Sequence, residues 1–271
     1  MTQQTNSSDA YPPPEIARKV EHIGVAKAHL DTLSLLVLAI LAGAFISLGA
    51  LLFTVVVTGS DLGFGPTRLL GGASFCLGLI LVVIAGAELF TGNNLIAMAW
   101  ASKLISTREV IRNWILVYIG NAIGCLGTVL LVYFADIASL SSGAVGTTAI
   151  SIATTKAELP IMEAFTRGIL CNALVCLAVW LTIGAHSVTD KILAIFLPIT
   201  AFVAAGFEHS IANWFFLPYG MVLATNNVIS LIGAIQNLIV VTLGNIIGGT
   251  LLVSGVYWLA YLRSERINKS D

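Results

Sequence analysis

"GAELFTGNN", residues 86–94, places four polar side chains inside a long apolar run. Glu88, Thr91, Asn93 and Asn94 stand together beside two glycines, which allow a backbone to leave the helical conformation. A helix buried in lipid or in a packed core would not carry this group, because polar side chains there need hydrogen-bond partners. The stretch therefore indicates an interruption in a helix.

The composition around this stretch is typical of an integral membrane protein. Of 271 residues, 57% are hydrophobic and only 10% are charged, and the mean hydropathy is +0.94. Apolar windows of about 20 residues, the length that crosses a hydrocarbon core, predict six membrane spans. They lie at roughly 33–57, 69–101, 111–135, 161–184, 192–216 and 235–262.

Several classes of function are disfavoured. A net charge of -1 without a basic block argues against a nucleic-acid partner. The four cysteines form no CxxC pair and stand near no histidine cluster, so we expect no metal site, and we expect no cofactor. No serine or cysteine nucleophile stands beside its own base, so we expect no enzyme and no catalytic residues.

The cations predict the orientation of the chain. With six spans, ten of them fall on one side: Arg18, Lys19, Lys27, Lys103, Arg108, Arg112, Lys191, Arg263, Arg266 and Lys269. Only Arg68 and Lys156 fall on the other side, and Arg167 lies near the start of the fourth span. By the positive-inside rule we expect a multi-pass protein of the plasma (inner) membrane with cytoplasmic N- and C-termini.

Three segments follow from this topology. We expect residues 1–31 to form a cytoplasmic N-terminal amphipathic segment, residues 32–262 a six-helix transmembrane domain, and residues 263–271 a cytoplasmic C-terminal tail. The amphipathic segment either lies flat on the membrane surface or leads into the first span as a short helix. The first span is expected to target the chain, because the first 30 residues lack the features of a removable signal peptide.

The chain also repeats itself. "GAELFTGN" recurs as "GFEHSIAN" at an offset of 120 residues, and "GNAIG" at 120–124 recurs as "GNIIG" at 244–248. Each half then holds three spans, and an odd number inverts the second copy relative to the first. We expect an all-α membrane protein of six helices in two inverted three-helix repeats, with broken second and fifth helices. This architecture is typical of channels and transporters.

The shared polar residues of the two breaks suit structural support. Glu88 with Asn93, and Glu208 with Asn213, offer hydrogen bonds to the backbone groups that a broken helix frees. Thr91 and His209 are not shared, because they align with Ile211 and Leu89. Since His209 is the only histidine in a predicted span and titrates near neutral pH, we expect this unshared pair to be functional.

These motifs resemble those of the formate/nitrite transporter family of pentameric anion channels. "GAELFTG" and "GILCNALVCLA" at 168–178 resemble the two family signatures, and "GFEHSIAN" and "LGNIIGG" are also similar to family stretches. Ala173 stands where a larger apolar residue is usual. The resemblance implies an aquaporin-like fold, one pore in each protomer of a homopentamer surrounded by membrane lipid, and carriage of small monovalent anions. The sequence looks closest to the formate branch.

The resemblance also implies roles for individual residues. Thr91 and His209 would be the central pair of the substrate pathway, and Lys156 would lie near the outer mouth. Two asparagines would lie near the path, Asn172 and Asn245. Four apolar residues would narrow the pore: Phe75, Leu79, Phe90 and Phe202.

A proton-assisted passage would suit such a pore. A bare anion meets a large desolvation cost at an apolar constriction, whereas the neutral acid crosses at far lower cost. Lys156 would attract the anion, and His209 would either donate a proton or stabilise the anion while solvent supplies one. Arg167 either snorkels outward or binds an anion.

Other functions stay open at this point. A nitrite or hydrosulfide channel would have the same fold, and a channel for neutral solutes would be indifferent to pH and to His209. A membrane haem or electron-transfer protein would use His209 as a ligand, usually with a second axial ligand on a facing helix. A water channel is disfavoured, because the chain has no pair of Asn-Pro-Ala loops.

Overall fold

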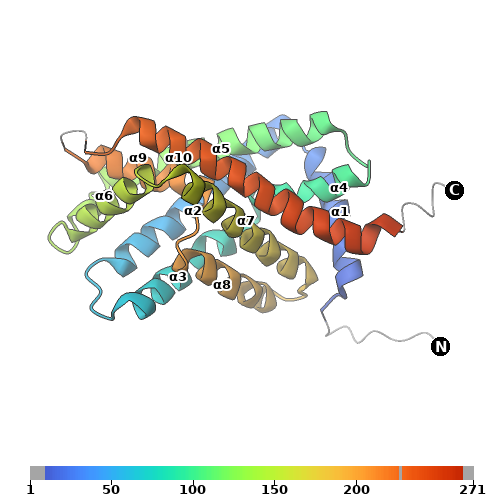
Figure 1. Ribbon diagram of the computed structural model, residues 1–271, viewed down its shortest axis with the longest axis horizontal. Coiled ribbons are helices and arrows are strands. Elements are labelled where there is room, and N and C mark those ends of the chain that lie inside the picture. The colour runs from blue at the N-terminus through green and yellow to red at the C-terminus, as the bar shows by residue number, and fades with distance from the viewer. Residues whose placement is uncertain (1–9, 226–227, 265–271) are drawn as a thin grey trace.

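The fold is that of a computed structural model, which describes residues 10–225 and 228–264. The outer parts of the expected N-terminal segment and C-terminal tail, with Arg266 and Lys269, lie outside the described residues. The described chain is all helical and forms an elongated bundle (Figure 1). All-α architecture was predicted by the sequence and is confirmed.

The described residues form ten α-helices and several short π- and 3₁₀-helical turns. The α-helices are α1 (Pro13–Ala28), α2 (Thr32–Val57), α3 (Phe64–Leu81), α4 (Ala97–Ala101), α5 (Thr107–Phe134), α6 (Ala144–Ala157), α7 (Ile161–Gly184), α8 (Val188–Ala204), α9 (Ser210–Leu223) and α10 (Leu231–Ile247). The shorter turns are η1 (Val82–Gly86), η2 (Gly92–Ile96), η3 (Ile137–Ser139), η4 (Gly248–Gly255) and η5 (Trp258–Leu262).

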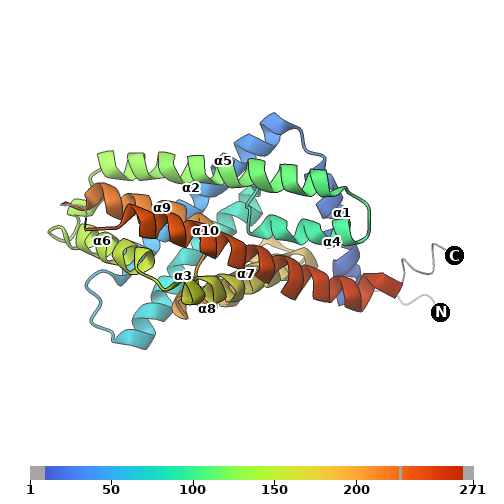
Figure 2. The same ribbon diagram turned by 45° about the horizontal axis from the view of Figure 1, so that its top comes forward.

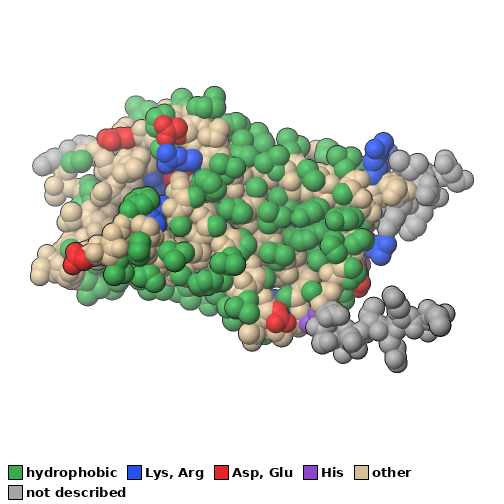
Figure 3. Space-filling view, turned by 60° about the horizontal axis from the view of Figure 1, so that its bottom comes forward, with side chains coloured by type: hydrophobic (Ala, Val, Ile, Leu, Met, Phe, Trp, Pro, Cys, Tyr) green, Lys and Arg blue, Asp and Glu red, His purple; other side chains and the backbone are tan. Residues whose placement is uncertain are grey.

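Five helical segments in the described chain are long and apolar enough to cross a membrane. They are Thr32–Val57, Phe64–Gly86, Thr107–Phe134, Ile161–Gly184 and Leu231–Leu262. The fifth predicted window, 192–216, does not form one helix but is divided between α8 and the shorter apolar helix α9. Hydrophobic side chains cover the middle of one face, and charged side chains lie toward its ends (Figure 3).

Glycines with positive φ stand where the chain leaves the helical conformation. After α3 and the π-helical turn η1, Gly86 has φ 85°, and the backbone is extended at Ala87 before the helix resumes at η2. After α8, Gly206 has φ 75°, and α9 begins at Ser210. A side chain at either glycine would strain the backbone, because L-residues rarely adopt this conformation.

Close helix packing surrounds these two segments. α2 packs against α5 and α3, and α10 packs against α7, as both ribbon views show (Figure 2). Small residues permit the approach: a Cβ added to Gly124 would lie 2.0 Å from the Ile40 carbonyl oxygen. A Cβ added to Gly248 would lie 2.1 Å from the Ile169 carbonyl oxygen. The repeated "GNAIG" and "GNIIG" motifs therefore allow close packing at equivalent places in the two halves, of α5 on α2 and of α10 on α7.

Two helices differ from the sequence expectation. α6 was not predicted, because its alanine and threonine content gives no apolar window of membrane length; it packs against α9 and ends beside Lys156. α1 does form, but its apolar face, including Ile16 and Val20, packs against other helices of the same chain. It lies at the same end of the bundle as η5 (Figures 1 and 2).

Candidate functional site

A polar network fills the first helix interruption. Lys27, from α1, donates from Nζ to Glu88 Oε1 at 2.6 Å and to Asn93 Oδ1 at 3.0 Å. Asn93 Nδ2 donates to Glu88 Oε2 at 2.7 Å and to Asn113 Oδ1 at 3.0 Å. Asn113 Nδ2 donates in turn to the Lys27 carbonyl oxygen at 3.1 Å. The buried Glu88 carboxylate is thus neutralised by a cation from the N-terminal helix.

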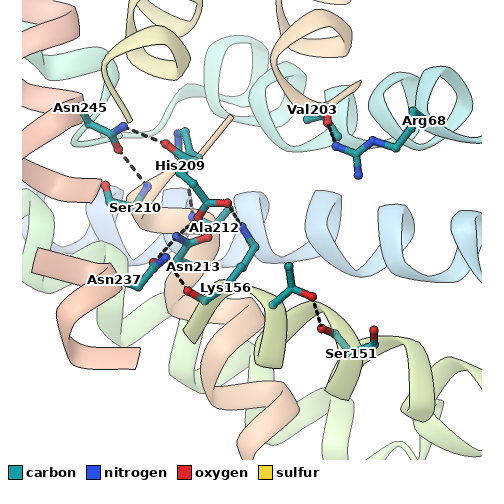
Figure 4. A network of polar contacts seen from close by, with 12 residues as sticks. Arg68, Ser151, Lys156, Val203, His209, Ser210, Ala212, Asn213, Asn237 and Asn245 are labelled. Atoms are coloured by element: carbon teal, nitrogen blue, oxygen red, sulfur yellow. Dashed lines mark hydrogen bonds and ion pairs between the residues drawn. The ribbon is translucent and has the colours of Figure 1, made fainter. Parts of the chain in front are cut away.

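The second interruption repeats this network with different elements (Figure 4). Lys156 Nζ, at the end of α6, donates to Glu208 Oε1 at 2.8 Å. Asn213 Nδ2 donates to Glu208 Oε2 and to Asn237 Oδ1, both at 2.7 Å. Asn237 Nδ2 donates to the Lys156 carbonyl oxygen at 2.9 Å. One difference is that Asn213 Oδ1 is buried without a partner among the described residues, whereas Asn93 Oδ1 accepts a hydrogen bond.

The backbone groups of the first break are bonded by an asparagine of the "GNAIG" motif. Asn121 Oδ1 accepts from the Phe90 N–H at 2.9 Å, and its Nδ2 donates to the carbonyl oxygens of Ala39 at 2.7 Å and Glu88 at 2.9 Å. Because the three backbone groups are buried, their partner must come from the protein. Asn121 was not among the residues predicted from the sequence, although the repeated motif was a signal for it.

Asn245, of the "GNIIG" motif, has the same contacts at the second break. Its Oδ1 accepts from the Ser210 N–H at 2.9 Å, and its Nδ2 donates to the carbonyl oxygens of Gly168 at 2.8 Å and Glu208 at 3.0 Å. Asn245 therefore supports the backbone of the second break. Glu88 and Glu208 each bind a lysine as well as the asparagine of their own break. Nothing in the sequence indicated that Lys27, Asn113 and Asn237 would join these networks.

Thr91 and His209 meet where the two helix interruptions come together. His209 Nε2 lies 3.0 Å from Thr91 Oγ1, and both residues are buried. His209 Nδ1 accepts the N–H of Ala212 at 3.1 Å, as the N-cap of α9. The neutral ring therefore carries its proton on Nε2 and donates it to the Thr91 hydroxyl, whose own hydrogen is left for another acceptor.

Asn172 holds the backbone at this point. Its Nδ2 donates to the carbonyl oxygens of Asn245 at 2.7 Å and Thr91 at 3.3 Å. Its Oδ1 is buried and has no partner among the described residues. Asn172 thus fixes the segment that carries the Thr91 hydroxyl.

Two cavities approach this pair from opposite sides. One, of about 270 Å³, is lined by residues that include Phe75, Phe202 and His209. The other, of about 870 Å³, lies beside α1 and is lined by residues that include Leu79 and Leu89. Phe75 and Leu79 are one turn apart on α3, about 6 Å along the helix axis, so successive turns of this helix border the two cavities. We call the first the outer cavity and the second the inner cavity.

Three of the four predicted constriction residues border these cavities. The rings of Phe75 and Phe202 meet edge to face at 5.6 Å between centroids, and Phe202 stacks on His209 at 5.9 Å. Phe90 packs against Tyr118 at 5.0 Å and is not among the described residues that line either cavity. The apolar part of the partition is therefore built from α3 and α8.

The outer cavity is basic. Its described lining holds Arg68, Lys156 and Arg167 with a single carboxylate, Glu208. Arg167 Nη2 donates to Glu163 Oε2 at 2.7 Å, across one turn of α7. Within the described ranges, no group of three His, Cys, Asp or Glu residues is placed to hold a metal ion.

Known proteins share this chain's sequence and fold over most of its length. A family model described as "Formate/nitrite transporter" matches residues 14–259. The chain is 40% identical to "Formate channel FocA" of Escherichia coli (strain K12), over 96% of this chain and 98% of that protein. A solved "Pentameric formate channel with formate bound" is 42% identical with a TM-score of 0.80, over 85% of this chain and 98% of that one. An "FNT family ion channel" is 32% identical with a TM-score of 0.84, over 91% and 98%.

Proposed function

Because the chain belongs to the formate/nitrite transporter family, we propose that it is a membrane channel for small monovalent anions, with formate as its main substrate. The chain is a multi-pass membrane protein and a transporter, not an enzyme. The formate-bound neighbour and the formate channels among the relatives support formate over nitrite or hydrosulfide.

The proposal includes a six-span, aquaporin-like architecture with an inverted repeat. In support, equivalent lysine, glutamate and asparagine networks fill the two helix interruptions, and α8 with α9 takes the place of one long span. Residues 32–262 form the channel domain, preceded by the segment 1–31 and followed by the tail 263–271. The pentameric neighbour supports a homopentamer, and the two cavities within a single chain support one pore in each protomer.

We place the protein in the plasma (inner) membrane with both termini in the cytoplasm. The ten-to-two distribution of cations supports this orientation, as does the location of α1 and η5 at the same end of the bundle. The inner cavity then opens to the cytoplasm and the outer cavity to the opposite side.

One observation carries the mechanism: the Thr91–His209 hydrogen bond lies at an apolar partition between two cavities. An anion in the outer cavity is attracted by Lys156 and meets Phe75 and Phe202, where water is excluded. Protonation in the outer cavity, before the anion enters this dry contact, removes the charge whose desolvation forms the barrier. The neutral acid crosses to the inner cavity and ionises again.

The tautomer of His209 favours solvent as the source of that proton. Transfer from His209 requires an imidazolium, and a second proton on Nδ1 would face the Ala212 N–H that Nδ1 now accepts. The neutral ring can instead donate its Nε2–H, and Thr91 its hydroxyl hydrogen, to the oxygens of the anion. We therefore assign His209 and Thr91 to orient and stabilise the anion while a solvent proton neutralises it.

Uptake into proteoliposomes tests this function. Formate, nitrite and hydrosulfide are compared in parallel, with and without an inward proton gradient, for the native protein and His209→Asn. Asparagine retains an acceptor for the α9 N-terminus but cannot titrate. We expect formate to be preferred, its uptake to rise with the gradient, and the substitution to alter both. Equal flux of unrelated neutral solutes, insensitive to pH and to the substitution, would eliminate the mechanism.

A further inference from the structure

Two arginines of the outer cavity have no task in the mechanism above. Arg68 projects from α3 and Arg167 from α7, and both line the cavity that also contains Lys156. The only carboxylate among its described lining residues, Glu208, is already held by Lys156 at 2.8 Å. The two guanidinium charges are therefore not neutralised by a carboxylate of the cavity wall.

The guanidinium of Arg68 is held in place by the backbone. Its Nε donates to the Ala204 carbonyl oxygen at 3.0 Å, and its Nη2 donates to that of Val203 (Figure 4). These carbonyls end α8, where a cation is favoured by the helix dipole. A guanidinium has five N–H groups, so Arg68 keeps N–H groups for a further acceptor while its position is fixed.

Arg167 uses fewer of its N–H groups than Arg68 does in the described chain. Its single ion pair in the described chain uses Nη2 and reaches Glu163, whose side chain is 51% exposed. An exposed pair of this kind is weak, so an anion entering the cavity can compete with Glu163 for the guanidinium. The remaining N–H groups of each arginine lie in the plane of its guanidinium, so they can donate in parallel to the two oxygens of a carboxylate.

We propose that Arg68 and Arg167 form a carboxylate-binding subsite in the outer cavity. The subsite captures the transported monoanion before the Phe75–Phe202 partition, a role that rests on the proposed function. It also binds small dicarboxylates, which block the pore: one proton neutralises a monoanion, but a dicarboxylate that gains one proton is still charged and cannot cross the apolar partition.

The direct test is calorimetric titration of the purified protein with oxalate, which requires no transport. We expect Arg167→Gln to weaken oxalate binding about tenfold, the loss of one charge-assisted contact. Glu163→Gln releases Arg167 from its ion pair and should tighten binding by about two- to fivefold. Arg108→Gln, which removes an exposed cation from the first turn of α5, should change nothing.

The opposite signs at Glu163 and Arg167 separate binding from a structural ion pair. If the pair only held α7 together, both substitutions would act in the same direction, and that result would overturn the proposal. Absence of oxalate binding to the native protein at about 10 mM would also overturn it. Should Arg167→Gln fail to fold, the surface variant Glu163→Gln still decides the sign, and Arg167→Lys should bind oxalate with intermediate affinity.

Formate uptake supplies an independent second readout. Arg167→Gln should raise the half-saturating formate concentration several-fold and leave the maximal rate unchanged, and external oxalate should compete with formate. Arginine-dependent oxalate binding without formate uptake would retain the subsite and remove the proposed function. Formate uptake that ignores both Arg167 and oxalate would retain the function and remove the subsite.

Discussion

The two ring nitrogens of His209 have different tasks. Nδ1 caps α9 through the Ala212 N–H, and Nε2 faces Thr91 Oγ1 at 3.0 Å. The sequence identified both residues because the duplication does not share them. The family resemblance implied that they form a central pair, but the repeat itself could not place them in contact, because the two are separated by 118 positions.

The two glutamate ion pairs near the outer cavity should contribute differently to the stability of the protein. The side chains of Lys156 and Glu208 are 15% and 7% exposed, whereas those of Arg167 and Glu163 are 39% and 51% exposed. Glu208→Ala leaves a buried, unpaired ammonium and should cost about 3–5 kcal/mol of stability. Glu163→Ala should cost less than about 1 kcal/mol. Thermal unfolding in detergent measures both, and similar losses would show that the Lys156–Glu208 pair is not held in a low-dielectric site.

At the scale of elements, the sequence predicted where the spans lie better than how the breaks are held. Apolar windows located the long helices, since membrane length requires continuous apolar residues. They missed α6, whose composition is ordinary for any short helix. Loop support was assigned to Glu88 with Asn93 and to Glu208 with Asn213, whereas Asn121 and Asn245 bond the freed backbone groups from distant helices. A repeated motif signals such an asparagine, but its hydrogen-bond partners depend on helix packing.

That packing can be tested at α5 with two glycines of one helix. Gly124→Ala would place Cβ 2.0 Å from the Ile40 carbonyl oxygen, so α2 and α5 must separate and stability should fall by about 3 kcal/mol. Gly127→Ala meets nothing within 4 Å and should be neutral or raise stability by up to about 1 kcal/mol. Thermal unfolding in detergent again gives the comparison. Equal effects at the two positions would mean that the α2–α5 contact does not limit stability.

At the scale of the whole molecule, two cavities are separated by a partition to which Phe75 and Leu79, one helical turn apart on α3, both contribute. The repeat predicts this arrangement in outline, because each break brings polar groups toward the centre from its own side. What it does not predict is the asymmetry. Leu89 lines the inner cavity where its counterpart His209 lines the outer one, and Asn213 Oδ1 is unpartnered among the described residues where Asn93 Oδ1 is bonded. The two sides of the partition therefore present different chemistry to a permeating anion.

If the partition is the barrier to charged solutes along the whole path, its aromatic side chains should determine how fast ions leak through the protein. Phe202→Ala removes the ring that meets Phe75 and covers His209, so water should enter the partition and lower the cost of passing a bare ion. We expect chloride efflux from proteoliposomes to rise, and the stimulation of formate uptake by a proton gradient to fall. The truncation should also cost about 3–5 kcal/mol of stability, so folded protein is selected by gel filtration before reconstitution.

Phe196→Ala is the matched control for this prediction. Phe196 lies on the same helix, α8, but its side chain is 40% exposed and is not among the described residues of either cavity. Its removal should leave chloride efflux and the gradient response unchanged. If chloride efflux were no faster with Phe202→Ala than with Phe196→Ala, the barrier to ions could not lie at the Phe75–Phe202 contact. The hydrogen-bonded layer of Thr91 and His209 would then have to exclude ions by itself.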